Sequence, residues 1–182
     1  PAISTTYNIG KNLVITLKTS DGKALTDKNI VVALNNKLYE KTTDSNGQVV
    51  ISSYNMVPKS YYIASVIFYG DSNYVGSNVN AKVVVNKALP KITASNKAYK
   101  VKVKTKQYTI TLKNNKNAVL KSKPVTLKVN GKTYKATTNS KGKATFKITK
   151  LTKKGTFKAV IKYAGDSCYK SVSKTTKITV KK

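Results

Sequence analysis

The chain repeats itself once, with a period of 95 residues. The stretch "IVVALNNKLYEKTTDSNGQV" begins at Ile30 and aligns with "VTLKVNGKTYKATTNSKGKA", which begins at Val125. The alignment runs without a gap from about Leu13 to Gly76 of the first copy. A fixed period of this length is typical of a tandem array of one structural unit. We therefore expect two domains, residues 1–88 and 89–182, with the boundary near Pro90, where a proline interrupts a strand pattern.

Apolar and polar residues alternate within each copy, and this alternation predicts half-buried antiparallel strands. In the second copy, for example, Tyr108, Ile110 and Leu112 alternate with polar residues. Asn130 and Gly131 stand between two such segments, which is a strong hairpin signal. We find no amphipathic helix. Seven short strands per copy predict an all-β chain of two tandem immunoglobulin-like antiparallel β-sandwiches, with an open barrel as the alternative.

The charge of the chain is extreme. All 35 basic residues are lysines and only six residues are acidic, which gives a net charge of +29. Such a chain attracts polyanions of any kind: nucleic acid, anionic lipid, acidic glycan or wall polymer. Specific recognition of bases and phosphates relies on the two-pronged guanidinium of arginine, which is missing here. A non-specific nucleic-acid-binding module is therefore an alternative function and not our first interpretation.

The residue types exclude most catalytic sites. The chain has no histidine, one cysteine (Cys168) and six scattered acids. It cannot form an internal disulfide, a zinc site or a histidine-dependent nucleophile. We expect no enzyme, no cofactor and no metal. There is also no run of about 18 apolar residues, so we expect no transmembrane helix in this part of the protein.

The pentapeptides "GDSNY" and "GDSCY" occur at equivalent places in the two copies. One carboxylate per copy is too few for calcium, which takes six to eight oxygen ligands. Glycine favours a backbone conformation that other residues avoid, and a following aspartate can cap backbone N–H groups across a turn. A tyrosine can then cover the edge of the core. We interpret the pentapeptides as a structural turn motif made by Gly70, Asp71 and Tyr74, and by Gly165, Asp166 and Tyr169.

A covalent alternative is an amide bond between a lysine and an asparagine or aspartate, assisted by a buried acid. Asp166 is the only acid in the second copy. Its place in a turn does not favour burial beside a core lysine, so this bond is not our preferred interpretation.

The two copies differ in their surfaces. Residues 1–87 carry a net charge of +4, whereas residues 88–182 carry +25. The strand alternation points four lysines of the second copy outward, and these form our candidate polyanion-binding site: Lys128, Lys158, Lys162 and Lys177. The equivalent strands of the first copy carry apolar residues at outward positions, which form a candidate partner face: Val31, Ala33, Tyr61, Ile63 and Ile67.

The apolar face depends on the register of one strand. If that strand were slipped by one residue, Tyr62, Ala64, Val66 and Phe68 would point outward and the face would not exist. We expect the first register, and we expect a protein or domain partner to dock on the face, because a contiguous exposed apolar patch marks an interaction site.

The pentapeptides and their flanks resemble a known family. A "VNGKTYKATTNSKGKATF" hairpin, followed by "GTFKAVIKYAGDSCYKS" and a short last strand, is similar to the immunoglobulin-like repeats of bacterial and archaeal surface adhesin-like proteins, especially those of methanogens. The resemblance covers nearly the whole chain. It implies an extracellular, cell-surface location and a parent chain with further immunoglobulin-like repeats.

The function that this resemblance implies is non-catalytic. The repeats would act as stalk or adhesion modules that attach to a glycan or protein on a host or neighbouring cell, or to an anionic wall polymer. A wall-binding accessory module of an enzyme is a further alternative.

Overall fold

The computed structural model describes residues 2–182, and all its regular elements in this range are strands. The chain divides into two compact units, which comprise residues 1–87 (unit 1) and 88–182 (unit 2). The division falls one residue before the boundary expected from the sequence. No helix long and apolar enough to cross a membrane occurs in the described range.

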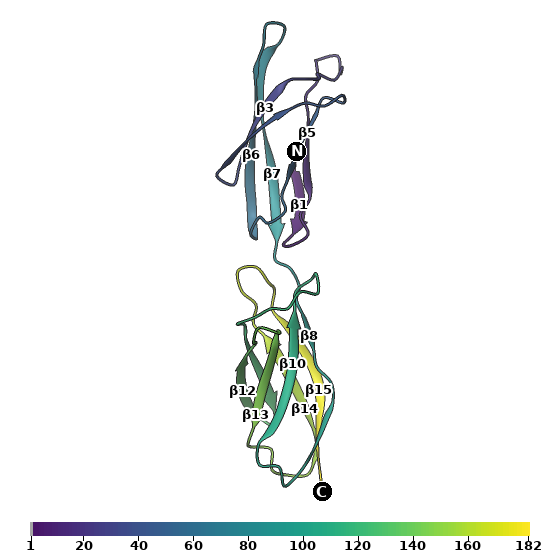
Figure 1. Cartoon of the computed structure of the whole chain (residues 1–182), viewed down its shortest axis with the longest axis vertical. Helices are drawn as coiled ribbons and strands as arrows, with labels where there is room; N and C mark the ends of the chain where they lie inside the picture. The colour runs from purple at the N-terminus through teal and green to yellow at the C-terminus, as the bar shows by residue number, and fades with distance from the viewer. Residues whose placement is uncertain (1) are drawn as a thin grey trace. The chain divides into compact units, whose positions relative to one another are not determined.

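Unit 1 is a sandwich of two sheets (Figure 1). The larger sheet has the strand order β1-β7-β6-β3-β4, and the smaller sheet pairs β2 with β5. The strands are β1 (Ala2–Thr6), β2 (Asn12–Thr16), β3 (Asn29–Leu34), β4 (Lys37–Thr42), β5 (Gln48–Ser52), β6 (Lys59–Gly70) and β7 (Val75–Asn86).

Unit 2 has the same arrangement with one more strand. Its larger sheet has the order β12-β11-β14-β15-β9, and its smaller sheet has the order β13-β10-β8. The strands are β8 (Lys91–Thr93), β9 (Lys97–Lys100), β10 (Lys106–Lys113), β11 (Pro124–Val129), β12 (Lys132–Thr137), β13 (Lys143–Ile148), β14 (Gly155–Tyr163) and β15 (Val172–Lys181).

The prediction of immunoglobulin-like sandwiches is confirmed, with two corrections. First, the sheets are not wholly antiparallel, because β1 pairs in parallel with β7 and β9 pairs in parallel with β15. Second, unit 2 has eight strands where seven were expected. Its first strand is divided: β8 lies in the smaller sheet, and the chain continues after three residues as β9 in the larger sheet. This change of sheet places β9 beside the last strand.

Alternation along the strands decides which side chains form the core. In β6, Tyr62, Ala64, Val66 and Phe68 are buried, whereas the residues between them are exposed or half-buried. The slipped register is therefore not the one observed. The same alternation in β14 buries Ala159, Ile161 and Tyr163.

The β-hairpin turns follow from residues that tolerate a positive φ angle. Asn130 and Gly131 have φ angles of 47° and 72°, and Asn35 and Asn36 of the first copy have 52° and 58°. Positive φ at both central residues is the conformation of a two-residue type I′ turn, which matches the twist of the strands.

We predict that residues 88–182 fold on their own, because their core is contained within the unit. Expressed alone, this segment should unfold in one cooperative thermal transition, and its amide resonances should overlay those of unit 2 in the full chain, apart from residues near the cut. Heteronuclear NMR spectra of both proteins provide the measurement. A collapsed spectrum of the isolated segment would show that the two units depend on each other.

Candidate functional site

The Gly-Asp-Ser loops connect the last two strands of each unit and are organised by their aspartates. In unit 2, Oδ1 of Asp166 accepts hydrogen bonds from the backbone N–H groups of Cys168 at 2.8 Å and Tyr169 at 2.9 Å. In unit 1, Asp71 accepts equivalent bonds from Asn73 and Tyr74. Each aspartate therefore closes its own turn.

The glycine of each loop is required by both conformation and space. Gly70 and Gly165 have φ angles of 89° and 85°, which side chains rarely adopt. A Cβ atom at Gly165 would lie 2.7 Å from the carbonyl oxygen of Tyr169, and one at Gly70 would lie 2.7 Å from that of Tyr74. Any other residue would push the two sides of the loop apart.

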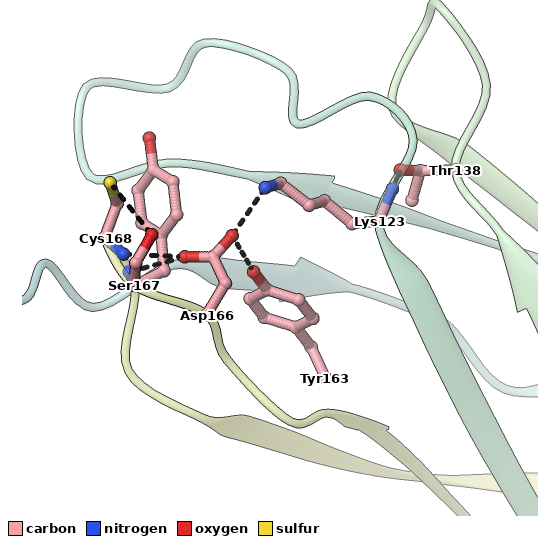
Figure 2. Close-up of polar contacts among 7 residues, drawn as sticks. Lys123, Thr138, Tyr163, Asp166, Ser167 and Cys168 are labelled. Carbon is pink, nitrogen blue, oxygen red and sulfur yellow. Dashed lines mark hydrogen bonds and ion pairs between the residues drawn. The ribbon is translucent and has the colours of Figure 1, made fainter.

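The structure brings a lysine to each loop that the sequence analysis did not identify. Nζ of Lys123 lies 2.5 Å from Oδ2 of Asp166, and Nζ of Lys28 lies 2.5 Å from Oδ2 of Asp71. Figure 2 shows the carboxylate of Asp166 between the ammonium group of Lys123 and the hydroxyl group of Tyr163, which donates a hydrogen bond of 2.8 Å to Oδ2. The sequence analysis considered only a core lysine beside Asp166, whereas Lys123 comes from a neighbouring loop and is partly exposed.

A threonine fixes the segment that carries each lysine. The hydroxyl oxygen of Thr138 accepts a hydrogen bond from the backbone N–H of Lys123, and the N–H of Thr138 donates to the carbonyl oxygen of Lys123. Ser122, just before the lysine, has a positive φ angle of 57°. The first copy repeats this arrangement with Thr43, Lys28 and Asp27. The lysine is thus held where it meets the aspartate.

These contacts favour the charged carboxylate of Asp166. Partial burial alone would raise the pKa of Asp166, but hydrogen bonds from Lys123, Tyr163 and two backbone N–H groups outweigh it and hold that pKa well below its usual range. Burial, followed by the hydrogen bond to Asp166, raises the pKa of the Tyr163 hydroxyl. In unit 1, the hydrogen bond from Lys28 and then that from the Asn73 N–H lower the pKa of Asp71.

The charged pair argues against an amide bond between these residues. Amide formation needs a neutral amine and loses one water, whereas Asp166 is stabilised as a carboxylate and is the only acid of unit 2. The described residues contain no group of three histidine, cysteine, aspartate or glutamate side chains able to hold a metal ion. The hydrogen bonds of Asp71 and Asp166 close the turns in which they stand, and a structural role for the loops stays our prediction.

The four candidate lysines of unit 2 lie together on the outer face of its larger sheet. Lys128 is on β11, Lys158 and Lys162 are on β14, and Lys177 is on β15, which are three adjacent strands. All four side chains are exposed. Lys158 lies directly opposite Lys177, and Lys128 lies opposite Val160, between the two lysines of β14. We call these four residues the lysine face.

The equivalent outer face of unit 1 carries a set of apolar residues beside polar ones, since Ser65 lies opposite Ala33 and Lys82 lies opposite Ile63. Tyr61 and Ile63 on β6 are 49% and 45% exposed, and Ile67 on the same strand is half-buried opposite Val31 of β3. Ala33 completes the predicted set and is half-buried. We call these five residues the apolar face.

One residue of this region was missed in the sequence. Leu38 on β4 pairs with Ala33 and is 73% exposed, so it extends the apolar face to the edge of the sheet. Its equivalent in the second copy is Thr133, and comparing the two copies strand by strand would have shown it. Ala33, Leu38 and Ile63 also line a shallow hollow beside the β3–β4 turn.

Comparisons with solved structures support the immunoglobulin-like sandwich fold, whereas comparisons of sequence found no match. No protein-family model matches the chain, and no curated protein matches it in sequence. Among solved structures, the titin domains z1z2, solved in complex with telethonin, are 8% identical with a TM-score of 0.51; the match covers 99% of this chain and 92% of that one.

A second similar structure is invasin, a bacterial integrin-binding protein. It is 17% identical with a TM-score of 0.50, and the match covers 94% of this chain but 39% of invasin. The chain thus corresponds to less than half the length of invasin. At these identities, the comparisons define the class as immunoglobulin-like β-sandwiches.

We predict that Asp166→Asn lowers the free energy of unfolding of unit 2 by about 1–3 kcal/mol at pH 7, because it removes charged partners from partly buried donors. The difference from the unsubstituted chain should shrink below about pH 4. The aspartate has an ordinary pKa near 3.9 when unfolded and a lower one when folded, so its contribution is complete above pH 4 and is lost as the pH falls through the folded value.

Urea unfolding at several pH values, followed by hydrogen-exchange mass spectrometry of unit 2 peptides, measures this difference. Glu40→Gln, which removes an exposed carboxylate from unit 1, is the control and should leave unit 2 unchanged. A difference that stays constant down to pH 2 would contradict the role of the Asp166 charge.

Proposed function

We propose that the chain is a pair of non-catalytic immunoglobulin-like repeats of a secreted cell-surface protein, and that it attaches surfaces to one another. In this proposal unit 2 binds anionic wall glycans through its lysine face. Unit 1 contacts a protein partner on the other cell or in the same array. The observation that carries the proposal is the contrast between the two outer faces, which are built on one scaffold.

The lysine face is electrostatically unfavourable without a bound anion. Like charges directly opposite each other on neighbouring strands destabilise a sheet, and Lys158 faces Lys177 in this way. Asp166 is the only acidic side chain in unit 2, and it is engaged by Lys123. The face lysines are therefore neutralised by ions from solution, and a polymer with repeated negative charges would displace these ions.

The spacing of the lysines suits an extended polymer better than a compact anion. Lys158 and Lys162 are four residues apart on one strand, which corresponds to about 13 Å, and Lys128 lies on the next strand between them. Lysine binds anions as a point charge without the fixed geometry of arginine. The face would bind by charge density and have little sequence or linkage specificity.

The apolar face of unit 1 supports the second half of the proposal. Exposed apolar residues that are scattered singly need no explanation, but a contiguous set marks an interaction site. Lys82 lies over the ring of Tyr61 at 5.1 Å and opposite Ile63 on the neighbouring strand. We propose that a protein or domain partner docks there.

The likeness to invasin gives this proposal a precedent in architecture, since that protein is described as a bacterial integrin-binding protein. The narrower resemblance to methanogen repeats and the identity of the bound surface stay predictions.

We predict that replacing Lys128, Lys158, Lys162 and Lys177 with glutamine weakens the binding of polygalacturonate to the full chain and flattens its salt dependence. Each neutralised anion releases about one counterion, so the slope of log affinity against log salt should fall by about 3–4. Isothermal titration at a series of sodium chloride concentrations provides the measurement.

A matched control removes the same charge elsewhere on unit 2. Four exposed lysines of the smaller sheet and of the turn before β13 are replaced with glutamine: Lys91, Lys141, Lys143 and Lys147. If both quadruple variants lose the same amount of binding, the polymer recognises net charge and the lysine face has no special role. If mixed-sequence duplex DNA binds more tightly than polygalacturonate through the same four lysines, the nucleic-acid alternative replaces the proposal. Dextran, which is neutral, should not bind.

A further inference from the structure

The chain contains two Asn-Gly dipeptides, and the structure holds them differently. Asn130 and Gly131 form the turn between β11 and β12, whereas Asn46 and Gly47 lie in the turn before β5. In such a pair the peptide nitrogen of the glycine can attack the side-chain carbonyl carbon of the asparagine, because glycine has no side chain to obstruct the approach. Whether this attack occurs depends on how freely the peptide between the two residues can turn.

Gly47 is restrained on both sides. Its N–H donates to the carbonyl oxygen of Asp44 at 2.9 Å, and its own carbonyl oxygen accepts from the N–H of Leu17 at 2.8 Å. Oδ1 of Asp44 also accepts a hydrogen bond of 2.8 Å from the N–H of Asn46. A Cβ atom at Gly47 would lie 2.7 Å from the carbonyl oxygen of Leu17, so the glycine is closely packed as well. The peptide between Asn46 and Gly47 therefore cannot turn without breaking these contacts.

The turn of Asn130 and Gly131 lacks such restraints. Both residues are exposed, and beyond the chain neighbours no atom lies within 4 Å of the place that a Cβ atom of Gly131 would occupy. In the described range, neither the N–H of Gly131 nor the side-chain amide of Asn130 makes a hydrogen bond. Both reacting groups are thus open to solvent and free to move.

The hairpin also allows the central peptide of this turn to turn over. The φ angles of 47° and 72° are those of a type I′ turn, and type II′, the other common two-residue hairpin turn, differs mainly in the orientation of that peptide. The conversion makes φ of Gly131 negative, which glycine adopts as readily as a positive value. In the type II′ form the nitrogen of Gly131 lies on the same side of the Cα–C bond of Asn130 as its Cβ atom. A five-membered ring can then close while β11 and β12 stay paired.

The charge around this turn favours the attacking form of the peptide nitrogen, which is the deprotonated one. Lys128 lies two residues before Asn130, and Lys132 follows Gly131 directly. Residues 88–182 carry a net charge of +25, whereas residues 1–87 carry +4. Because nearby positive charge stabilises an anion, a peptide anion forms more readily at Gly131 than at Gly47.

We propose that Asn130 is a site of spontaneous covalent modification, at which this asparagine converts to aspartate and isoaspartate without an enzyme. The nitrogen of Gly131 bonds to Cγ of Asn130, its proton passes to hydroxide, and the side-chain nitrogen leaves as ammonia with a proton from water. Water then adds to one carbonyl carbon of the resulting succinimide and breaks the bond from that carbon to the ring nitrogen. Cleavage at Cγ gives aspartate, and cleavage at the main-chain carbonyl carbon gives isoaspartate.

The products change unit 2 in two ways. Each adds a carboxylate to a unit whose only acid is Asp166. Isoaspartate also inserts one more carbon atom into the main chain of a two-residue turn, which loosens the pairing of Val129 with Lys132. The proportion of modified Asn130 increases with the age of the chain. The proposal is independent of the proposed adhesive function, because it concerns the chemistry of one turn.

The test incubates the full chain at neutral pH in water enriched in heavy oxygen, which labels each new carboxylate as it forms. Mass spectrometry of chymotryptic peptides then follows Asn130 and Asn46 over several weeks, and electron-transfer fragmentation distinguishes aspartate from isoaspartate. We expect labelled product to form at least tenfold faster at Asn130 than at Asn46. In the chain unfolded in guanidinium chloride the two rates should differ only a few-fold, because the restraints on Gly47 are then lost.

The variant Gly131→Ala is the matched control, since it keeps Asn130 but adds a Cβ atom that hinders the attack. Its labelling at Asn130 should fall at least tenfold and leave Asn46 unchanged. Equal rates at the two sites in the folded chain would overturn the proposal. It would also be overturned if Asn130 stayed unlabelled in the folded chain while the unfolded chain reacted, because the hairpin would then protect it. Undiminished labelling in Gly131→Ala would show direct hydrolysis of the side-chain amide instead of ring closure.

Discussion

Burial of every second side chain between two sheets is the constraint on which both units depend. Along β6 and β14, one set of alternating residues fills the core, and the other set meets solvent. Exchanging a buried apolar residue costs several kcal/mol, whereas an exposed one is replaced at little cost. The inner residues of the two copies have therefore stayed alike, while Ile63 and Lys158, which are equivalent outer residues, differ completely.

The Gly-Asp-Ser loops, at the edge of the sandwich, also keep the residues that hold the fold alike in both copies. The glycine, the aspartate and its lysine are present in both copies, because backbone conformation and a charged pair close the turn. Tyr163 adds a fourth hydrogen-bond donor to Asp166, where the first copy has Phe68. These contacts of the Gly-Asp-Ser loops lie at the edge of the sandwich, whereas the surfaces proposed to bind partners lie on the sheets.

Strand positions, hairpin turns and the inward residues could be predicted because they depend on local alternation and on residues such as Asn130 and Gly131. The partnership of Lys123 with Asp166 could not, since it joins loops 43 residues apart and depends on how Thr138 holds the intervening segment. The parallel pairing of β1 with β7, and of β9 with β15, was also missed. Alternation predicts which face of a strand is buried but not the direction in which the strand runs.

The central claim is that the scaffold tolerates either outer face and that the face decides what binds. Replacing Ala33, Ile63 and Ile67 with lysine gives unit 1 the outer residues of Lys128, Lys158 and Lys162, beside the lysine already present at position 82. We expect the triple variant to keep its thermal unfolding temperature within a few degrees and its NMR core resonances unchanged, and to gain salt-sensitive binding of polygalacturonate that maps to β3, β6 and β7 in titrations. Loss of the folded unit 1 spectrum, or a folded variant whose outer sheet shows no perturbation by the polymer at low salt, would contradict the claim.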